Sequence, residues 1–222
     1  MPSDPTARRP LKSRKTAWAG AVSRLLLRWK FTPNAVSVLS VVFAAAGAAC
    51  LYAAPREACA GCQAFWWLMA VAGIQLRLLC NLMDGLLAVE GGLKSAVGDL
   101  YNEVPDRLAD TLLLVAAGYG AAHWHPWAAD AGWAAAAGAL STAYARALGA
   151  SLTGKQDFRG PFAKQHRMAI LTFACIACAV EYAVNRSGHL MPWVLALVAA
   201  GSVATAARRL LTTAFLLRSR NP

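Results

Sequence analysis

Ionisable and amide side chains recur along two stretches of the sequence that are otherwise apolar. Side chains of this kind are costly inside an apolar helix, and they usually face a cavity and serve a function. The first stretch carries Arg77, Asn81, Asp84 and, just past its end, Glu90, and the second carries Asp99, Asn102, Glu103, Asp106, Arg107 and Asp110. These two groups are the first candidates for a functional site.

The spacing of these residues indicates which way they point. An α-helix turns by about 100° per residue, which places Arg77, Asn81 and Asp84 on one face together with the small residues Gly85 and Ala88. In the second stretch, steps of four residues form a stripe whose members are Gly98, Asn102 and Asp106, widened by Asp99, Glu103 and Asp110. Two facing polar stripes joined by a short loop predict a cleft that opens toward that loop. The small residues on these faces would let a backbone or a flat ligand approach closely.

Clustered oxygen ligands without histidine or cysteine favour a hard divalent cation, such as Mg²⁺, Mn²⁺ or Ca²⁺. The spacing leaves a second interpretation open, in which the same residues form an ion-paired core of the helix bundle. Arg77 and Arg107 would then neutralise the acids, and no ligand would be bound.

The composition predicts that lipid surrounds the helices that carry these residues. Of the 222 residues, 58% are hydrophobic and 15% are charged, whereas soluble domains carry about 25% charged residues. Backbone polar groups in lipid must pair internally, which favours helices. We therefore predict an all-α integral membrane protein with six transmembrane helices, at residues 35–54, 64–88, 98–121, 129–152, 168–185 and 192–217.

Three regions are expected along the chain. Residues 1–16 are predicted to be a disordered basic N-terminus, and residues 17–31 to form an amphipathic helix on the membrane face. Thr32 and Pro33 are typical of a helix start. Residues 32–222 are predicted to form the six-helix membrane domain.

The net charge of +11 is explained by the positive-inside bias of membrane proteins, because the basic residues lie at the ends of apolar runs. Lys and Arg gather at both termini and in the segments 89–97 and 153–167, which predicts that the termini and the cleft face the cytoplasm. Arg208 and Arg209 are expected to reach the same interface with their charged ends. No separate basic domain is present that would hold a nucleic acid.

Residues 81–106 resemble the signature of the CDP-alcohol phosphotransferases, a family of membrane enzymes that includes the phosphatidylglycerophosphate, phosphatidylserine and phosphatidylinositol phosphate synthases. The family pattern is D-x2-D-G-x2-A-R-x8-G-x3-D-x3-D, and its spacing is intact here. The matching residues are Asp84, Gly85, Ala88, Gly98 and Asp106, while Asn81 and Asn102 take the first and third acidic places and Val89 replaces the arginine. The TPN sequence before the first span and the six-span plan are also similar to the family.

The resemblance implies a metal-dependent transferase of phospholipid biosynthesis, which we expect in the bacterial inner membrane. The residues implied to hold one or two Mg²⁺ or Mn²⁺ ions against the donor's diphosphate are Asn81, Asp84, Asn102 and Asp106. Those implied to contact CDP are Gly85, Ala88 and Gly98. Asp106 would also help deprotonate a small polar alcohol, whose oxygen attacks the β-phosphorus of a CDP-alcohol, such as CDP-diacylglycerol, and expels CMP. A homodimer is expected by the same analogy.

The departures from the family pattern bear on metal and phosphate binding. Asn81 and Asn102 keep a carbonyl oxygen but remove two negative charges, and Val89 cannot contact a phosphate. The residues that could compensate for these losses are Arg77, Glu90, Asp99, Glu103 and Asp110.

A basic cluster near the cytoplasmic ends of the fourth and fifth spans predicts a pocket for an acceptor phosphate or a lipid headgroup. Its members are Arg146, Lys164 and Arg167, of which Arg146 and Arg167 resemble basic positions in the family's acceptor region. The alternative is that these residues are ordinary positive-inside flanking charges.

Two functions remain open at this point. One is an active transferase with a modified metal site, and the other is a degenerate member that binds a nucleotide-lipid or acts as a scaffold without turnover. A small transporter is a weaker third hypothesis, because the acids cluster toward one side of the membrane and form no path across it.

Overall fold

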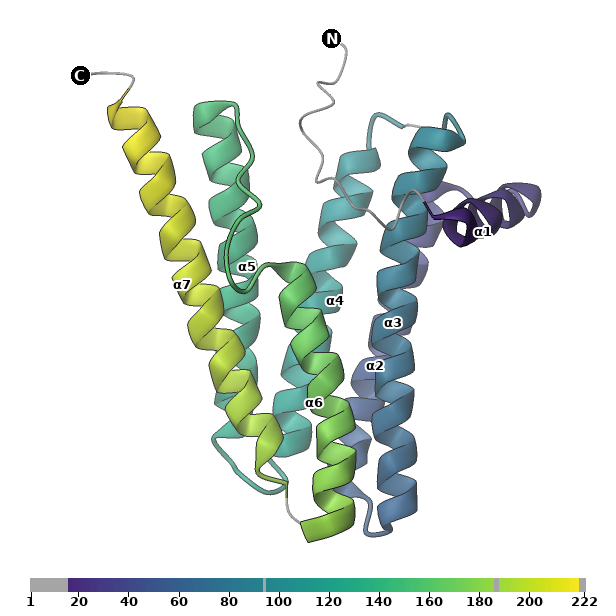
Figure 1. Ribbon diagram of the computed structural model, residues 1–222, viewed down its shortest axis with the longest axis vertical. Helices are drawn as coiled ribbons and strands as arrows, with labels where there is room; N and C mark the ends of the chain where they lie inside the picture. The colour runs from purple at the N-terminus through teal and green to yellow at the C-terminus, as the bar shows by residue number, and fades with distance from the viewer. Residues whose placement is uncertain (1–15, 94, 186–187, 220–222) are drawn as a thin grey trace.

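The computed structural model describes residues 16–93, 95–185 and 188–219, and these residues contain helices but no strand. The helices are α1 (Ala17–Arg28), α2 (Pro33–Ala53), the 3₁₀ turn η3 (Ala54–Arg56), α3 (Ala60–Glu90), α4 (Gly98–Ala121), α5 (Ala128–Thr153), α6 (Lys164–Asn185) and α7 (Leu190–Arg218) (Figure 1). The all-α prediction is confirmed, and α2 to α7 correspond to the six predicted stretches. α3 and α6 begin at Ala60 and Lys164, before the predicted starts at 64 and 168.

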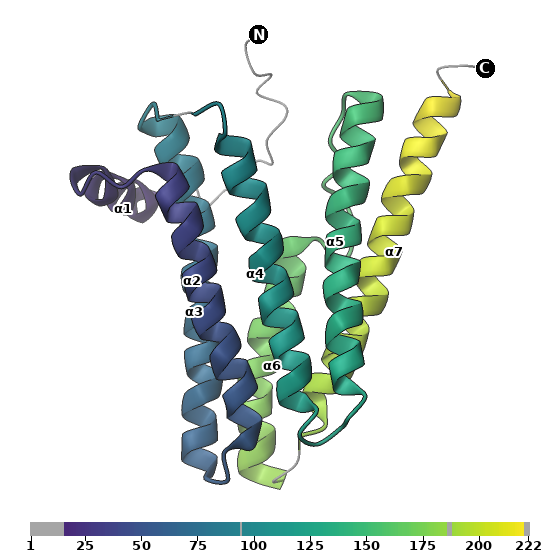
Figure 2. The same cartoon turned by 180° about the vertical axis from the view of Figure 1, so that it is seen from behind.

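The long helices α2 to α7 form a closed ring in which each packs against two neighbours. The order around the ring is α3, α2, α4, α5, α7 and α6, and α6 closes the ring by packing against α3. Figure 2 shows α4 between α2 and α5, with α7 beyond α5. α4 also contacts α7 across the ring. This central position lets side chains of α4 meet those of both α3 and α6.

Pairs of glycines bring neighbouring helices into backbone contact. A Cβ atom added to Gly73 of α3 would lie 2.7 Å from the Cα of Gly47 in α2. A Cβ added to Gly118 of α4 would lie 2.8 Å from the Cα of Gly132 in α5. Small residues at such crossings are typical of helices that associate in lipid, where close packing replaces the hydrophobic effect.

We expect Gly73→Ala to destabilise the protein by about 1–3 kcal/mol, as overpacking of a tight contact does. The new methyl group would force α2 away from α3, because three backbone atoms of α2 lie within 2.9 Å of it. Thermal unfolding in detergent measures the change. Gly61→Ala on the same helix is the matched control, because its Cβ would meet only the Cys59 sulfur, at 3.9 Å. Equal melting temperatures for the two variants would contradict the prediction.

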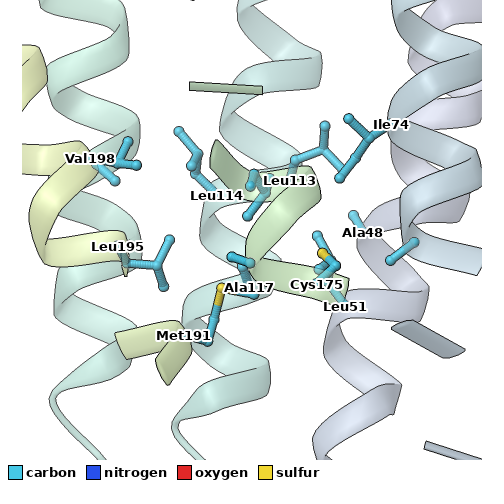
Figure 3. Packing of buried hydrophobic residues seen from close by; sticks show 14 of the residues in the cluster. Ala48, Leu51, Ile74, Leu113, Leu114, Ala117, Cys175, Met191, Leu195 and Val198 are labelled. Atoms are coloured by element: carbon cyan, nitrogen blue, oxygen red, sulfur yellow. The ribbon is translucent and has the colours of Figure 1, made fainter. Parts of the chain in front are cut away.

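An apolar core fills one end of the bundle, the end toward η3 and the α4–α5 connection. Figure 3 shows side chains from five helices meeting there, namely Ala48, Leu51, Ile74, Leu113, Leu114, Ala117, Cys175, Met191, Leu195 and Val198. The buried charged side chains lie toward the other end of the bundle. They are Arg77, Asp84, Asp106, Asp110, Arg167 and Arg209. The fold therefore separates an apolar half from a polar half, which contains the predicted site.

Four helices of the described chain are long and apolar enough to cross a membrane, at Pro33–Arg56, Ala60–Val89, Lys164–Val184 and Leu190–Arg218. α4 is less apolar because its first half carries the acids, and α5 is rich in alanine and glycine. The structure therefore shows a helical bundle with four candidate spans. That α4 and α5 also cross the membrane stays a prediction.

The predicted amphipathic segment contains α1, which packs beside α3 and projects sideways from the bundle (Figure 1). Ala19 is fully buried, and Val22 and Leu26 pack with it against α2 and α3. Trp18 and Trp29 remain largely exposed, as side chains at a membrane interface would be. The structure has a helix in this segment, but its role as an amphipathic helix on a membrane surface stays a prediction. Residues 1–15 lie outside the described part of the chain.

Candidate active site

Asp106 of α4 lies where three helices meet. Lys164, the first residue of α6, forms a salt bridge with Oδ2 of Asp106. On Oδ1, the Asn81 amide of α3 donates a hydrogen bond of 2.6 Å, and the Arg77 guanidinium lies at 3.5 Å. Asp106 is only 7% exposed. Its carboxylate is thus held by one amide and two cations from two different helices.

One turn further along α4, Asp110 joins two buried guanidinium groups. Its Oδ1 accepts a hydrogen bond of 2.6 Å from Arg77, and its Oδ2 accepts one of 2.8 Å from Arg167 of α6. Arg167 also donates to the Thr142 hydroxyl of α5 and to the Phe162 carbonyl. These contacts tie α3, α4, α5 and α6 together. They match the ion-paired interpretation of the acids, with Arg77 and Arg167 as the neutralising partners of Asp110.

Asp84, on α3, is the second buried carboxylate of the motif. Its Oδ2 accepts a hydrogen bond of 2.7 Å from the Ser37 hydroxyl of α2. Asn81, one turn before Asp84 on the same helix, donates a hydrogen bond to Asp106. The two carboxylates that match the family pattern therefore share one polar region, although they come from different helices.

A separate ion-pair group lies one turn closer to the start of α4. Glu103 accepts a hydrogen bond of 2.6 Å from Arg107 and forms a second salt bridge with Arg146 of α5. Arg146 also donates to the Gln156 side chain. The predicted acceptor-site residue Arg146 is thus linked to α4 by the same acid that was predicted to compensate at the metal site.

The segment between α5 and α6 determines where Lys164 and Arg167 lie. Gly154 ends α5 in the left-handed conformation, and the chain then runs back along the bundle to start α6 well below the ends of α5 and α7 (Figure 1). The Phe162 amide donates to the Thr205 hydroxyl of α7, which fixes the segment against that helix. As a result, the first turn of α6 begins beside Asp106.

Arg209 helps to fix the same segment, and the expectation that it extends to the interface is wrong. It is 5% exposed, and its guanidinium donates to the carbonyls of Arg159 and Thr142. The Thr142 carbonyl belongs to α5, and the Arg159 carbonyl belongs to the segment between α5 and α6. Arg209 therefore has a structural role between α5, α7 and the connecting segment.

Other predicted residues lie at the edge of the polar region. Asn102 and Asp99 are exposed on the first turns of α4, while Gly85, Ala88 and Gly98 are half-buried. A Cβ added to Gly98 would meet only the Ser95 hydroxyl, at 3.4 Å, so packing within the described chain does not require a glycine there. The side chain of Glu90 lies outside the described part of the structure.

The donor atoms of the motif suit a hard cation, although they carry little charge. Asp84 and Asp106 supply carboxylates, and Asn81 and Asn102 supply amide oxygens, the ligand types that Mg²⁺ and Mn²⁺ accept. Among the described residues, no group of three or more His, Cys, Asp or Glu side chains is arranged to hold a metal. A cation here would therefore depend on two carboxylates and on the amides.

Two contributors to the polar region were not predicted as site residues. Ser37 binds Asp84 and Thr142 binds Arg167, and both side chains are buried. Ser37 follows the TPN sequence by one turn, which is a usable signal, because a hydroxyl on the first span could face the second. Thr142 has no comparable signal, since its role depends on the position of α6.

The fold and the site define a helical membrane protein with an ion-paired polar region near one end of the bundle. No protein-family model matches the sequence, and no curated protein sequence matches it either. Similar folds occur in crystal structures of phosphatidylinositol phosphate synthase from Mycobacterium tuberculosis. The structure with CDP-DAG bound gives a TM-score of 0.71 at 20% identity, covering 89% of this chain and 94% of that chain.

Two further structures of that enzyme agree. The complex with manganese and citrate gives a TM-score of 0.69 at 20% identity, covering 88% of each chain. The apo form gives 0.67 at 22% identity, covering 88% of this chain and 95% of that chain. The protein therefore has the fold of a CDP-alcohol phosphotransferase, and the resemblance stated from residues 81–106 is confirmed at the level of the fold.

Proposed function

We propose that this protein is a CDP-alcohol phosphotransferase that transfers a phosphatidyl group from CDP-diacylglycerol to an acceptor hydroxyl and releases CMP. The observation that carries the proposal is that Asp84 of α3 and Asp106 of α4 are both buried at the polar end of the bundle, where Asn81, one turn before Asp84, donates a hydrogen bond to Asp106. These are the motif acids that match the family pattern, and the fold around them is that of an enzyme that binds CDP-DAG.

The proposed roles follow from the chemistry of the side chains. Asn81, Asp84, Asn102 and Asp106 would hold one or two Mg²⁺ or Mn²⁺ ions, which would neutralise the diphosphate and stabilise the leaving CMP. Asp106 accepts the proton of the acceptor hydroxyl while the hydroxyl oxygen attacks the β-phosphorus. Gly85, Ala88 and Gly98 leave space for CDP beside the two helices. Ser37 orients the Asp84 carboxylate.

The basic residues of α5 and α6 are proposed to face the acceptor. Arg146, Lys164 and Arg167 surround the acids of α4, and Arg146 and Lys164 are partly exposed. Their positions support an acceptor site on the side of α4 that lies away from α2. Both α1 and the end of α7 lie at the polar end of the bundle (Figure 1). This arrangement supports an active site on the same side of the membrane as α1 and the end of α7, and the bias of Lys and Arg favours the cytoplasmic side. We propose the bacterial inner membrane from the resemblance alone.

Release of CMP from CDP-diacylglycerol tests the proposal. The full chain is purified in detergent and incubated with the donor, with Mn²⁺ or Mg²⁺, and with glycerol phosphate, inositol phosphate and uncharged polyols as separate acceptors. We expect CMP to appear with at least one acceptor and to disappear when EDTA removes the metal. A chain that releases no CMP with any acceptor, but binds CDP, would contradict turnover.

A specific observation favours the rival function, a binding or scaffolding protein without turnover. Both oxygens of Asp106 already accept donors from Asn81, Arg77 and Lys164, as in a structural ion-pair core. Saturable CDP binding without CMP release across the whole acceptor panel would be the result expected of this rival.

A further inference from the structure

Lys164 has a position that the family pattern does not explain. Its ammonium group contacts Asp106, the carboxylate predicted to act as base and metal ligand. We propose that Lys164 acts as a resident counter-ion, so that the site takes up a divalent cation only together with the diphosphate of CDP. This inference rests on the proposed CDP-binding function.

The first argument is the charge of the polar region. The polar region contains three acids, Asp84, Asp106 and Asp110, and three bases, Arg77, Lys164 and Arg167. The neighbouring group contains one acid, Glu103, and two bases, Arg107 and Arg146. The described side chains thus leave no net negative charge to attract a divalent cation. Adding such a cation alone would leave a buried excess of positive charge, which is costly.

The second argument is that the diphosphate supplies the negative charge that the motif has lost. Asn81 and Asn102 stand where the family pattern has acids, so two negative charges are missing. The Asn81 amide donates a hydrogen bond to the Asp106 carboxylate. In this arrangement the Asn81 side chain acts as a donor and supports the carboxylate. The diphosphate of CDP, which carries at least two negative charges, would restore the negative charge that the two asparagines remove.

The third argument is that Lys164 can move, whereas the other cations cannot. Its side chain is 25% exposed, while those of Arg77 and Arg167 are 0% and 1% exposed. It is also the first residue of α6, and lysine has a long flexible stem that carries a single compact charge. Lys164 can therefore turn from Asp106 to a phosphate oxygen without displacing the buried arginines, which frees Asp106 when the nucleotide is present.

Binding of Mn²⁺ to the purified full chain, followed by the electron paramagnetic resonance signal of free Mn²⁺, tests this proposal. For the unmodified chain we expect binding to be about tenfold tighter or more with CDP than without it, the size expected for one uncompensated charge at short range. In Lys164→Met, the affinity without CDP should rise about tenfold, because the competing charge is gone. Lys155→Met, which removes an exposed lysine from the same segment, should behave like the unmodified chain.

A second variant keeps the test valid if Lys164→Met does not fold. Asn81→Asp combined with Asn102→Asp retains Lys164 but adds two carboxylates, and we expect it to bind Mn²⁺ without CDP. Equal Mn²⁺ affinities with and without CDP in the unmodified chain would overturn the proposal, as would an unchanged CDP-free affinity in a folded Lys164→Met variant. If the chain releases no CMP but still binds Mn²⁺ more tightly with CDP, the result counts against the transferase function only. The counter-ion role of Lys164 would then stand.

Discussion

Asp106→Asn is expected to lower the rate of CMP release by about a thousandfold, within the range lost when a general base is removed. The amide cannot accept the proton of the acceptor hydroxyl, and it removes one of the two carboxylates available to a cation. The measurement is the initial rate of CMP release from CDP-diacylglycerol at saturating acceptor. Because Asp106 lies beside Asn81 and Lys164, the side chain keeps hydrogen-bonding partners after the substitution.

Two controls separate a loss of chemistry from a loss of fold. Asp130→Asn makes the same change at an exposed position on the first turn of α5 and should leave the rate unchanged. The thermal unfolding of Asp106→Asn should shift less than that of Asp110→Asn, because its partner Lys164 is 25% exposed and can turn to solvent. A variant at position 106 that is folded and retains full activity would show that another group serves as the base.

Asp110→Asn is expected to destabilise the protein by about 3–5 kcal/mol, the usual cost of removing one partner from a buried ion pair. Asp110 separates the Arg77 and Arg167 guanidinium groups, and all three side chains are at most 2% exposed. Neutralising the acid leaves two buried cations facing each other. The effect is measured as the shift in thermal or denaturant unfolding in detergent, again with Asp130→Asn as the exposed control.

A double substitution identifies electrostatic repulsion as the cause. Arg167→Gln alone should also destabilise, because it leaves Asp110 with only Arg77. Combined with Asp110→Asn, however, it should cost less than the sum of the two single changes, since the second substitution removes the repulsion that the first creates. Additive losses would indicate that Asp110 and Arg167 stabilise the fold independently.

The sequence was sufficient to predict the helices, and less so their ends. Long apolar runs predict both α2 and α7. The start of α2 also follows from Thr32, whose hydroxyl accepts a hydrogen bond from the Ala35 amide. The start of α6 was predicted too late because Lys164, Gln165 and His166 are polar and resemble a loop. They are helical because the preceding segment is fixed to α7, a tertiary contact that local pattern does not contain.

The candidate site was predictable wherever it depended on a single helix. The stripes of α3 and α4 follow from the period of the α-helix, and they correctly turn Arg77, Asp84 and Asp106 inward. What could not be predicted was the partner of each acid. Arg167 lies 57 residues from Asp110 in the chain, and nothing in either local pattern indicates that they meet. The roles of the site residues in catalysis stay predictions.

The two salt bridges between α4 and α6 also define how deep α6 sits. Asp106 with Lys164 and Asp110 with Arg167 are spaced by about one helical turn on both helices. Lipid tails are as apolar as leucine, so hydrophobic contact alone does little to fix how far one apolar helix slides along its neighbour. Sliding α6 by one turn would place one cation against the wrong acid and the other against leucines such as Leu113. The two salt bridges thus fix the register of α6 against α4, which apolar contacts alone would not fix.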